Sequence, residues 1–395
     1  MTRRSAGTAE RVAEVSSPAM LSTFIVRLLA RWAERLADAD PQRLPTPPSP
    51  DECGSPPAQT PMEPEQDPDW VYPRVSRAAM GSLFEIYLAG HDREALVGAA
   101  NEALDEIERL DRQLSHYRMD SDIARMNAHA SRQWVRLEPR LYLLLKRCAE
   151  LSAQTHGAFD ITAAPLVKAW GFHEGTGRVP SSKEIEELLS RVGAHRIVFD
   201  DEEQLIWFSS PGMEVELGAV GKGYALDEAA ERLRFYGVGA ALLHGGQSTI
   251  YAHGAPPGED GWEFVLKDPR DRATPIDTVC LRDQAISTSG CYEQFLEIDG
   301  KRYCHILDPR SGEPVEGMLS VWVIAPSAME ADALSTAFFV MGRDATEEFC
   351  RLHPNLGVIM VTEQGDGIAV SRLGCIPAAG SNRSGPPDAA LPPQD

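Results

Sequence analysis

A glycine-rich turn between a short apolar run and a helix constrains this chain more than any other stretch. Residues 214–246 begin Glu-Val-Glu-Leu-Gly-Ala-Val-Gly-Lys-Gly, continue as a helical pattern with Ala225, Ala229 and Leu233 on one side, and end in an apolar strand. Glycines before a helix let backbone N–H groups approach an anion, which the helix N-terminus also favours. The stretch predicts a site for a phosphate-bearing ligand, and a glycine turn into an amphipathic helix is the alternative interpretation.

Two common phosphate-binding motifs are absent from the sequence. A Walker loop places Ser or Thr after Gly-Lys, whereas Gly223 follows Lys222, and no G-x-G-x-x-G occurs. Nucleic acid is also an unsuitable ligand, because the net charge of -21 opposes phosphate backbones. A small anionic ligand remains compatible with that charge, since a local site can oppose the overall field.

The cysteines predict a reduced compartment or inert buried thiols. There are seven, widely scattered and without a C-x-x-C pair. An odd, scattered set is not typical of a disulfide framework or a zinc site.

Composition along the chain predicts four regions. Residues 1–40 contain an amphipathic helix with an apolar stripe and arginines opposite, which could lie on a membrane surface but more often packs on protein. Residues 41–70 form a Pro-rich linker. Residues 71–375 form one large domain, and residues 376–395 a disordered tail.

The periodicity of the large domain predicts a mixed α+β fold rather than an alternating α/β one. We expect strands at 84–88, 196–200, 204–209, 237–246, 262–267, 277–281, 293–298, 302–307 and 319–325, and a closing hairpin at 357–371. We expect helices from Asp92 to about 114 and at 139–155, 184–191, 224–236, 328–341 and 344–352. The polar stretch 114–127 reads as a turn-rich segment.

The helix predicted at 328–341 carries a candidate metal site. Asp332 and Thr336 are four residues apart and share one helix face. A carboxylate and a hydroxyl so placed suit Mg²⁺, which takes oxygen ligands and keeps substrate phosphates and water in its shell. The alternative is an Asp that complements the helix dipole beside an ordinary mid-helix hydroxyl.

A second candidate combines hydroxyls on a predicted turn, residues 286–290, with a histidine at a predicted strand end. His305 and Asp308 lie where a general base would be useful. The alternative is a hairpin with an Asp-Pro turn and a core histidine.

Taken together and in order, these blocks resemble the ApbE family of bacterial FAD:protein FMN transferases. The resemblance covers most of residues 79–345. Its blocks are Met80-Gly-Ser-Leu-Phe-Glu-Ile, Leu114-Ser-His-Tyr117 to Asn127, Gly157-Ala-Phe-Asp160-Ile-Thr162, Glu216 to Asp227, His244-Gly-Gly, Thr288-Ser-Gly, His305-Ile-Leu-Asp308-Pro-Arg-Ser-Gly312 and Ala331-Asp-Ala-Leu-Ser-Thr336.

The resemblance implies a Mg²⁺-dependent enzyme that cleaves FAD, attaches FMN through a phosphoester to a Thr or Ser of a target protein, and releases AMP. It implies a metal site of Asp332, Thr336 and the backbone carbonyl of Ala219, with Asp332 as a catalytic residue. Our hypothesis for the base that takes the acceptor's proton is His305. The FAD contacts that it implies are Met80, Tyr117, Ala158, Phe159, Asp160, Glu216, Lys222, His305, Ile306 and Leu307.

Three positions depart from the family pattern. Glu216 stands where Asp is usual, Gln247 follows two glycines where Asp is common, and Cys291 after Thr-Ser-Gly is unusual. Many relatives carry a secretory or lipoprotein signal, but no apolar run precedes Cys53. We therefore expect a cytoplasmic protein, with peripheral contact to a membrane as a further possibility. The family analogy instead implies a periplasmic or membrane-associated location.

Two other functions stay open at this stage. A Mg²⁺-dependent FAD pyrophosphatase would use the same residues with water as acceptor, and a catalytically idle flavin-binding protein would use only the binding residues. The chain has no acceptor-like Asp-Gly-x-Thr-Ser segment, so the resemblance implies a separate acceptor, a redox or electron-transfer protein.

Overall fold

The structure is a computed structural model that describes residues 69–172, 177–246, 248–271, 273–291, 295–298, 300–365 and 367–378. The predicted helix within residues 1–40, nearly all of the predicted linker and Gln247 lie outside the described residues. At the other end Ala378 forms a β-bridge with Val279, so the described chain continues slightly past the predicted domain boundary at 375.

An eight-stranded antiparallel sheet forms the centre of the fold, in the order β1-β2-β6-β7-β10-β13-β14-β15. Its strands are β1 (Arg74–Ala79), β2 (Ser82–Ala89), β6 (Ala240–Gly245), β7 (Thr249–His253), β10 (Gln284–Gly290), β13 (Met318–Ala325), β14 (Gly357–Gln364) and β15 (Gly367–Gly374). Every residue of β6 is buried, because both faces of the sheet are covered. This mixed architecture confirms the predicted α+β class.

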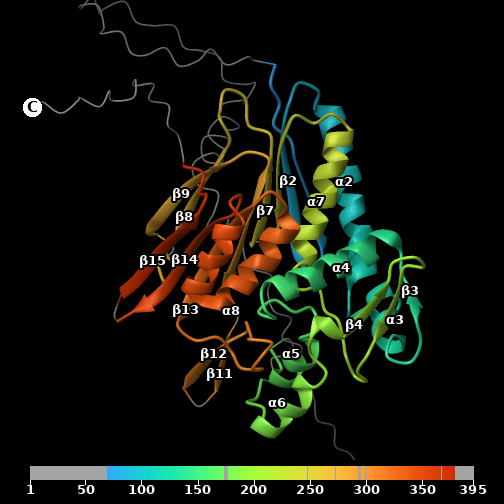
Figure 1. Cartoon of the computed structure of the whole chain (residues 1–395). Coiled ribbons are helices and arrows are strands. Elements are labelled where there is room, and N and C mark those ends of the chain that lie inside the picture. The colour runs from blue at the N-terminus through green and yellow to red at the C-terminus, as the bar shows by residue number, and fades with distance from the viewer. Residues whose placement is uncertain are drawn as a thin grey trace, which may run out of the picture.

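Helices cover one face of the sheet. They are α2 (Arg93–Leu114), α7 (Gly221–Phe235) and α8 (Ala328–Leu352), and α2 and α7 lie side by side in Figure 1. Helix α4 (Pro139–Gln154) lies below α7 in this view and contacts the 3₁₀ turn at 194–196. Asp92 caps α2 as predicted, accepting a hydrogen bond from the Ala95 N–H at 3.0 Å. Gly342 has φ 73° inside α8, which confirms the two helices predicted on either side of it.

A separate hairpin packs on the opposite face. Strands β8 (Trp262–Lys267) and β9 (Pro275–Leu281) pair with each other. Their alternate side chains, including Trp262, Phe264 and Leu266, are buried against the sheet in a second apolar cluster. The period-2 pattern that predicted both strands reflects this one-sided burial.

The remaining elements are smaller. They are α3 (Asp122–His129), β3 (Val135–Arg136), α5 (Ala164–Trp170), α6 (Ser182–Leu189), the 3₁₀ turn Ala194–Arg196, β4 (Ile197–Asp200), β5 (Leu205–Phe208), β11 (Phe295–Ile298) and β12 (Lys301–Cys304). The turn-rich interpretation of 114–127 is wrong where α3 forms. Ser121 caps this helix and Ile123 and Met126 are buried, but eight residues are too few to show a clear helical period.

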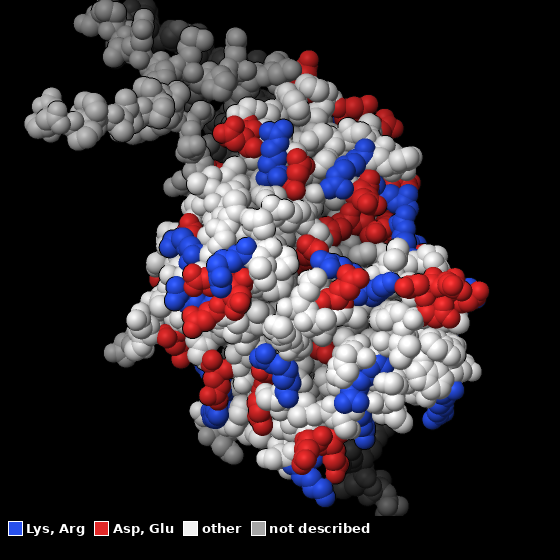
Figure 2. Space-filling view, in the orientation of Figure 1, with Lys and Arg blue, Asp and Glu red and all other residues white. Residues whose placement is uncertain are grey.

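Charged side chains of both signs alternate over the face shown in Figure 2, where Lys and Arg lie among Asp and Glu without a large basic patch. In the described ranges, no helix is both long enough and apolar enough to cross a bilayer.

A buried histidine predicts an acid-sensitive fold. His244 on β6 is 4% exposed, and no described group hydrogen-bonds either ring nitrogen. Burial lowers its pKa to about 4, so the unfolded chain binds this proton more readily. As far as His244 is concerned, the free energy of unfolding keeps its full value above about pH 6.5. It falls as the pH drops from there through about 4, by about 3 kcal/mol in total.

Urea unfolding at pH 7.5 and pH 4.5 would measure this loss of stability. The His244→Leu variant should show a smaller difference between the two pH values than the wild type. The matched control His156→Asn changes an exposed histidine and should leave the difference as it is. An equal pH dependence in His244→Leu and the wild type would contradict the assignment.

Candidate functional site

A cavity of about 350 Å³ gathers segments that are far apart in the sequence. Its walls come from the turn between α4 and α5, the loop that leads into α7, the end of β10, the chain after β12, and one face of α8. Of the sequence-predicted residues, it is lined by Ala158, Phe159, Asp160, Glu216, Ala219, Lys222, His305, Ile306, Leu307, Asp332 and Thr336. Met80 and Tyr117 are not among the lining residues.

Asp332 is the most enclosed acidic group of the cavity. It is 4% exposed, and its two oxygens accept hydrogen bonds from the Gly223 N–H (3.1 Å), Thr249 Oγ1 (3.1 Å) and Ser287 Oγ (3.0 Å). Thr336 follows one turn later on α8, within 3.3 Å of Ser289 Oγ. The carboxylate is therefore held in one orientation before any ligand binds.

The hydroxyls at 286–290 lie on strand β10, so the predicted turn is wrong. The strand pairs with both β7 and β13, and its side chains alternate. Ser287 and Ser289 face α8. Thr288, Ser289 and Gly290 line the cavity where the strand ends. Of these, Ser289 connects the cavity to α8, because its Oγ lies 2.8 Å from Ser335 Oγ.

The glycines at the start of α7 have a different role from the one predicted. The Gly221 N–H donates to the Leu217 carbonyl (2.7 Å) and the Gly223 N–H to Asp332, so neither is available to an anion. A Cβ on Gly223 would lie 2.1 Å from the Ala328 carbonyl oxygen. Gly223 is thus needed for the close approach of α7 to α8, and Lys222 supplies the positive charge at the cavity.

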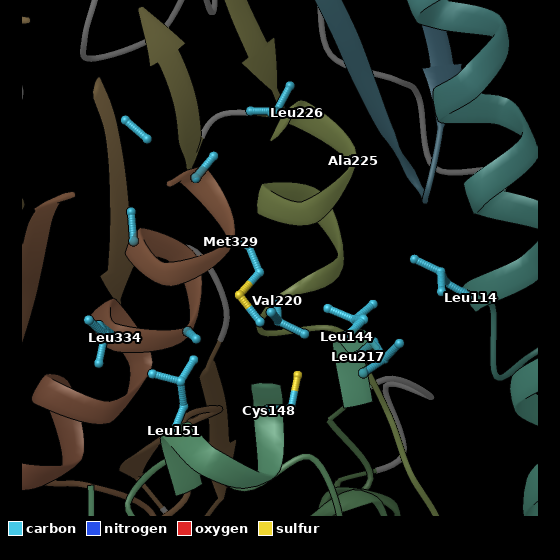
Figure 3. Packing of buried hydrophobic residues seen from close by; sticks show 14 of the residues in the cluster. Leu114, Leu144, Cys148, Leu151, Leu217, Val220, Ala225, Leu226, Met329 and Leu334 are labelled. Atoms are coloured by element: carbon cyan, nitrogen blue, oxygen red, sulfur yellow. The ribbon is translucent and has the colours of Figure 1, made fainter. Parts of the chain in front are cut away.

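The loop that leads into α7 is anchored in the apolar core. Figure 3 shows Leu217 and Val220 from this loop next to Met329 of α8 and Leu144 and Cys148 of α4. On α7, Asp227 accepts hydrogen bonds from two backbone N–H groups at the start of α8, those of Ala328 (2.8 Å) and Met329 (2.9 Å). The core therefore fixes the loop and α8, and with them both walls of the cavity.

The Gly223 contact gives a test of this arrangement. Replacing Gly223 with alanine should destabilise the protein by about 3 kcal/mol, because the new methyl group must push the two helices apart. Gly98→Ala is a matched control, since Gly98 is in α2 and its Cβ would meet nothing within 4 Å. That control should be neutral or slightly stabilising. Thermal unfolding of both variants measures the difference, and equal stability would contradict the packing role.

Asp160 forms a wall of the cavity. Its carboxylate accepts hydrogen bonds from the Thr162 N–H (2.8 Å), Thr162 Oγ1 (2.6 Å) and the Ala194 N–H (2.8 Å). A second cavity of about 710 Å³ lies on its other side and shares Asp160 and Pro309 with the first. These hydrogen bonds show that the Asp160 carboxylate stabilises the turn after α4.

Met80 and Tyr117 lie outside the cavity lining. The Met80 N–H donates to Asp111 Oδ1 (3.0 Å), which fixes a left-handed turn with φ 50°. Tyr117 is 67% exposed. Partial burial of its hydroxyl and the nearby Glu216 carboxylate raise the pKa of Tyr117, which places the ring beside a cavity residue.

His305 lies directly after β12, so residues 305–307 are not part of the strand predicted at 302–307. Leu307 instead forms an isolated bridge with Pro314. Next to His305, Cys304 forms a disulfide with Cys291. The prediction of thiols alone is wrong for this pair, because tertiary folding brings together two cysteines whose spacing is not diagnostic.

Several lining residues were not predicted from sequence, including Ser248, Val167 and Phe172. The contacts of Thr249 and Ser287 to Asp332 were also missed. The adjacent hydroxyl residues Ser248 and Thr249, one residue after Gly245-Gly246, were a usable signal. The described ranges hold no group of three or more His, Cys, Asp or Glu side chains arranged for a metal ion, so a metal here would depend on hydroxyl, carbonyl and ligand oxygens.

Comparisons of the sequence and of the structure with known proteins indicate the same family. The ApbE family matches residues 80–360. The FAD:protein FMN transferase of Escherichia coli K12 is 30% identical over 293 residues, which cover 73% of this chain and 83% of that protein. The crystal structure of the ApbE protein of Thermotoga maritima has a TM-score of 0.70 at 32% identity, covering 77% of this chain and 97% of that chain. For the apo flavinyl transferase ApbE of Pseudomonas stutzeri the TM-score is 0.68 at 30% identity, with 77% and 95% covered.

Proposed function

This chain belongs to the ApbE family, and on that premise we propose that it is an FAD:protein FMN transferase. The enzyme cleaves FAD, attaches FMN to a target protein through a phosphoester bond and releases AMP. The observation that supports this activity best is the cavity itself. It combines the oxygen ligands Asp332 and Thr336, the cation of Lys222 and the imidazole of His305.

The residues present fit Mg²⁺ better than a transition metal. Asp332 and Thr336 offer oxygen atoms on one face of α8, and Ala219 lines the cavity opposite them. Mg²⁺ takes few protein ligands and completes its shell with water and substrate phosphates. We propose that Asp332, Thr336 and the Ala219 carbonyl hold it, where it would neutralise charge on the FAD pyrophosphate.

We propose that residues on the other walls of the cavity bind and orient FAD. Lys222, at the start of α7, is placed to attract the pyrophosphate, and the helix N-terminus supports negative charge there. The apolar Phe159, Ile306 and Leu307 are 2–7% exposed and offer packing surface to the flavin or adenine ring. We place Met80 and Tyr117 at the rim, where they would contact the part of FAD that extends beyond the cavity.

The transfer step needs a base near the acceptor hydroxyl. We propose that His305 takes the proton as the acceptor oxygen attacks the phosphorus of the FMN half. The bond between that phosphorus and the bridging oxygen breaks, and AMP leaves with the electron pair. Positioning and charge stabilisation account for most of the rate in such displacements.

The acceptor is proposed to be a redox or electron-transfer protein that presents a Thr or Ser hydroxyl. Glu216 stands where the resemblance implies a shorter acidic residue, and its negative charge helps to raise the pKa of Tyr117. No described feature favours water over a protein hydroxyl, so the pyrophosphatase remains an outcome of the test.

Mass spectrometry of an acceptor domain, incubated with the full chain, FAD and Mg²⁺, tests the function. A mass gain of one FMN that is lost when EDTA is added is the expected result. Accumulation of FMN and AMP with an unmodified acceptor would favour the pyrophosphatase. Bound FAD that is never cleaved would favour an idle flavin-binding protein.

A further inference from the structure

The disulfide joins two segments that both end at the cavity. Cys291 directly follows Gly290, and Cys304 directly precedes His305, and both of these neighbours line the cavity. The two cysteines are 13 residues apart in the sequence, with Cα atoms 5.2 Å apart, a separation typical of disulfides.

The part of this segment that the structure describes has few links to the central sheet. Within the described residues, strands β11 and β12 pair with each other and not with the eight-stranded sheet. Figure 1 shows this hairpin below α8, apart from the central strands. The ring of Tyr303 packs 5.5 Å from that of Trp170 between centroids, and an exposed ion pair joins Lys301 to Glu316. Exposed pairs of this kind contribute little.

Among the described residues, the chain after His305 is held by elements other than β10, for example where the Trp170 indole N–H donates to the Gly312 carbonyl at 2.9 Å. The segment also bonds to itself. The Val315 N–H donates to the Ile306 carbonyl at 3.0 Å, and the Asp308 N–H to the Glu313 carbonyl at 2.8 Å. These bonds form a local loop and do not reach β10. The disulfide is therefore the covalent link between the backbone at His305 and the strand that carries Thr288 and Ser289.

We propose that the Cys291–Cys304 disulfide positions His305 in the cavity, so that its reduction converts the enzyme to a slow form that still binds FAD. The inference rests on the proposed function. A dithiol supplies two electrons and two protons, becomes a cyclic disulfide itself, and leaves two thiols on the enzyme. Cys291 is partly exposed whereas Cys304 is 7% exposed, so the attack is expected at the Cys291 sulfur.

The expected effect of reduction depends on which site residues are next to the Cys291–Cys304 disulfide. Asp332 and Thr336 are on α8 and Lys222 is on α7, so the metal ligands and the pyrophosphate contact stay in place after reduction. Displacement of a catalytic group by about 1 Å can cost about 100-fold in rate. We expect kcat for transfer to fall by about 10- to 100-fold. FAD affinity should fall much less, because Ile306 and Leu307 shift with His305 whereas the metal ligands and Lys222 do not. Disulfides persist in oxidising compartments, so the oxidised, active form fits a protein that works outside the reducing cytoplasm.

The experiment compares the full chain before and after treatment with dithiothreitol. Alkylation and mass spectrometry first establish that the bond is present and is then cleaved. FAD affinity, FMN transfer and hydrogen exchange of residues 300–308 are measured on both forms. Reduction should slow transfer, accelerate exchange in that segment and lower FAD affinity far less than it lowers the transfer rate, and reoxidation should restore the rate.

Variants separate positioning from general stability. Cys291→Ser should be slow from the start and insensitive to dithiothreitol, whereas Cys375→Ser, at an exposed free cysteine, should behave as the wild type does. Full transfer by the fully reduced enzyme would overturn the proposal, as would free thiols at both Cys291 and Cys304 in the protein purified without reductant. Loss of FAD binding together with transfer would also overturn it, since the defect would then be unfolding. A different outcome would separate the two proposals. If the oxidised wild type cleaved FAD at a rate that depends on reductant but transferred no FMN, the proposed transferase function would be wrong, whereas the proposed role of the disulfide would stand.

Discussion

Replacing Asp332 with asparagine should reduce flavin transfer by about 1,000-fold or more, since loss of a metal ligand removes several kcal/mol of charge stabilisation and each 1.4 kcal/mol is tenfold. The amide keeps the size of the carboxylate and one acceptor oxygen for Thr249 and Ser287. The negative charge is lost, and with it the attraction for Mg²⁺. The rate of FMN incorporation, measured over a range of Mg²⁺ concentrations, should stay low even at high metal.

Glu330→Gln is the matched control for Asp332. Glu330 is an acidic residue on the same helix, but its carboxylate pairs with Arg147 at 2.6 Å and does not line the cavity. Its neutralisation should leave transfer and Mg²⁺ dependence intact. Near-normal transfer by Asp332→Asn at ordinary Mg²⁺ would rule out Asp332 as the metal ligand.

Replacing His305 with asparagine should slow transfer by about 100- to 10,000-fold, which is the usual contribution of a general base. FAD binding should be retained, because the metal ligands and Lys222 are unchanged. Single-turnover measurement of acceptor modification, together with FAD titration, separates the two effects. The pH dependence of the residual rate should lose the limb that reports the base.

The control for His305 is His156→Asn, at an exposed histidine that borders only the second cavity. Asparagine tolerates its φ of 52°, so this variant should transfer at the wild-type rate. If His305→Asn transferred FMN as fast as this control, the base would have to be another group.

Local patterns in the sequence were sufficient for much of the fold. The long apolar stripe from Asp92 predicted α2, and the alternating residues at 262–267 predicted β8, since burial on one side imposes a period on the sequence. The same reasoning missed α3 and β10. Alternating hydroxyls on β10 resemble a polar turn, because what buries them is α8, more than 30 residues later in the chain.

The site was partly predictable for the same reason. Asp332 and Thr336 are neighbours on one helix turn, a relation that spacing alone determines. By contrast, the use of the Gly223 N–H by Asp332 depends on how α7 and α8 cross, and the Cys291–Cys304 bond depends on how a hairpin folds back. Spacing along the chain cannot predict contacts of that kind.

The sequence by itself determined the ApbE family, the mixed α+β class and most residues that line the cavity, because short-range periodicity and ordered motifs are local properties. Only the tertiary structure decided that Gly223 serves helix packing, that Asp160 is a hydrogen-bonded wall, and that Cys304 is bonded beside His305. Each of these depends on the distance between segments remote in sequence, which the packing of the whole core sets.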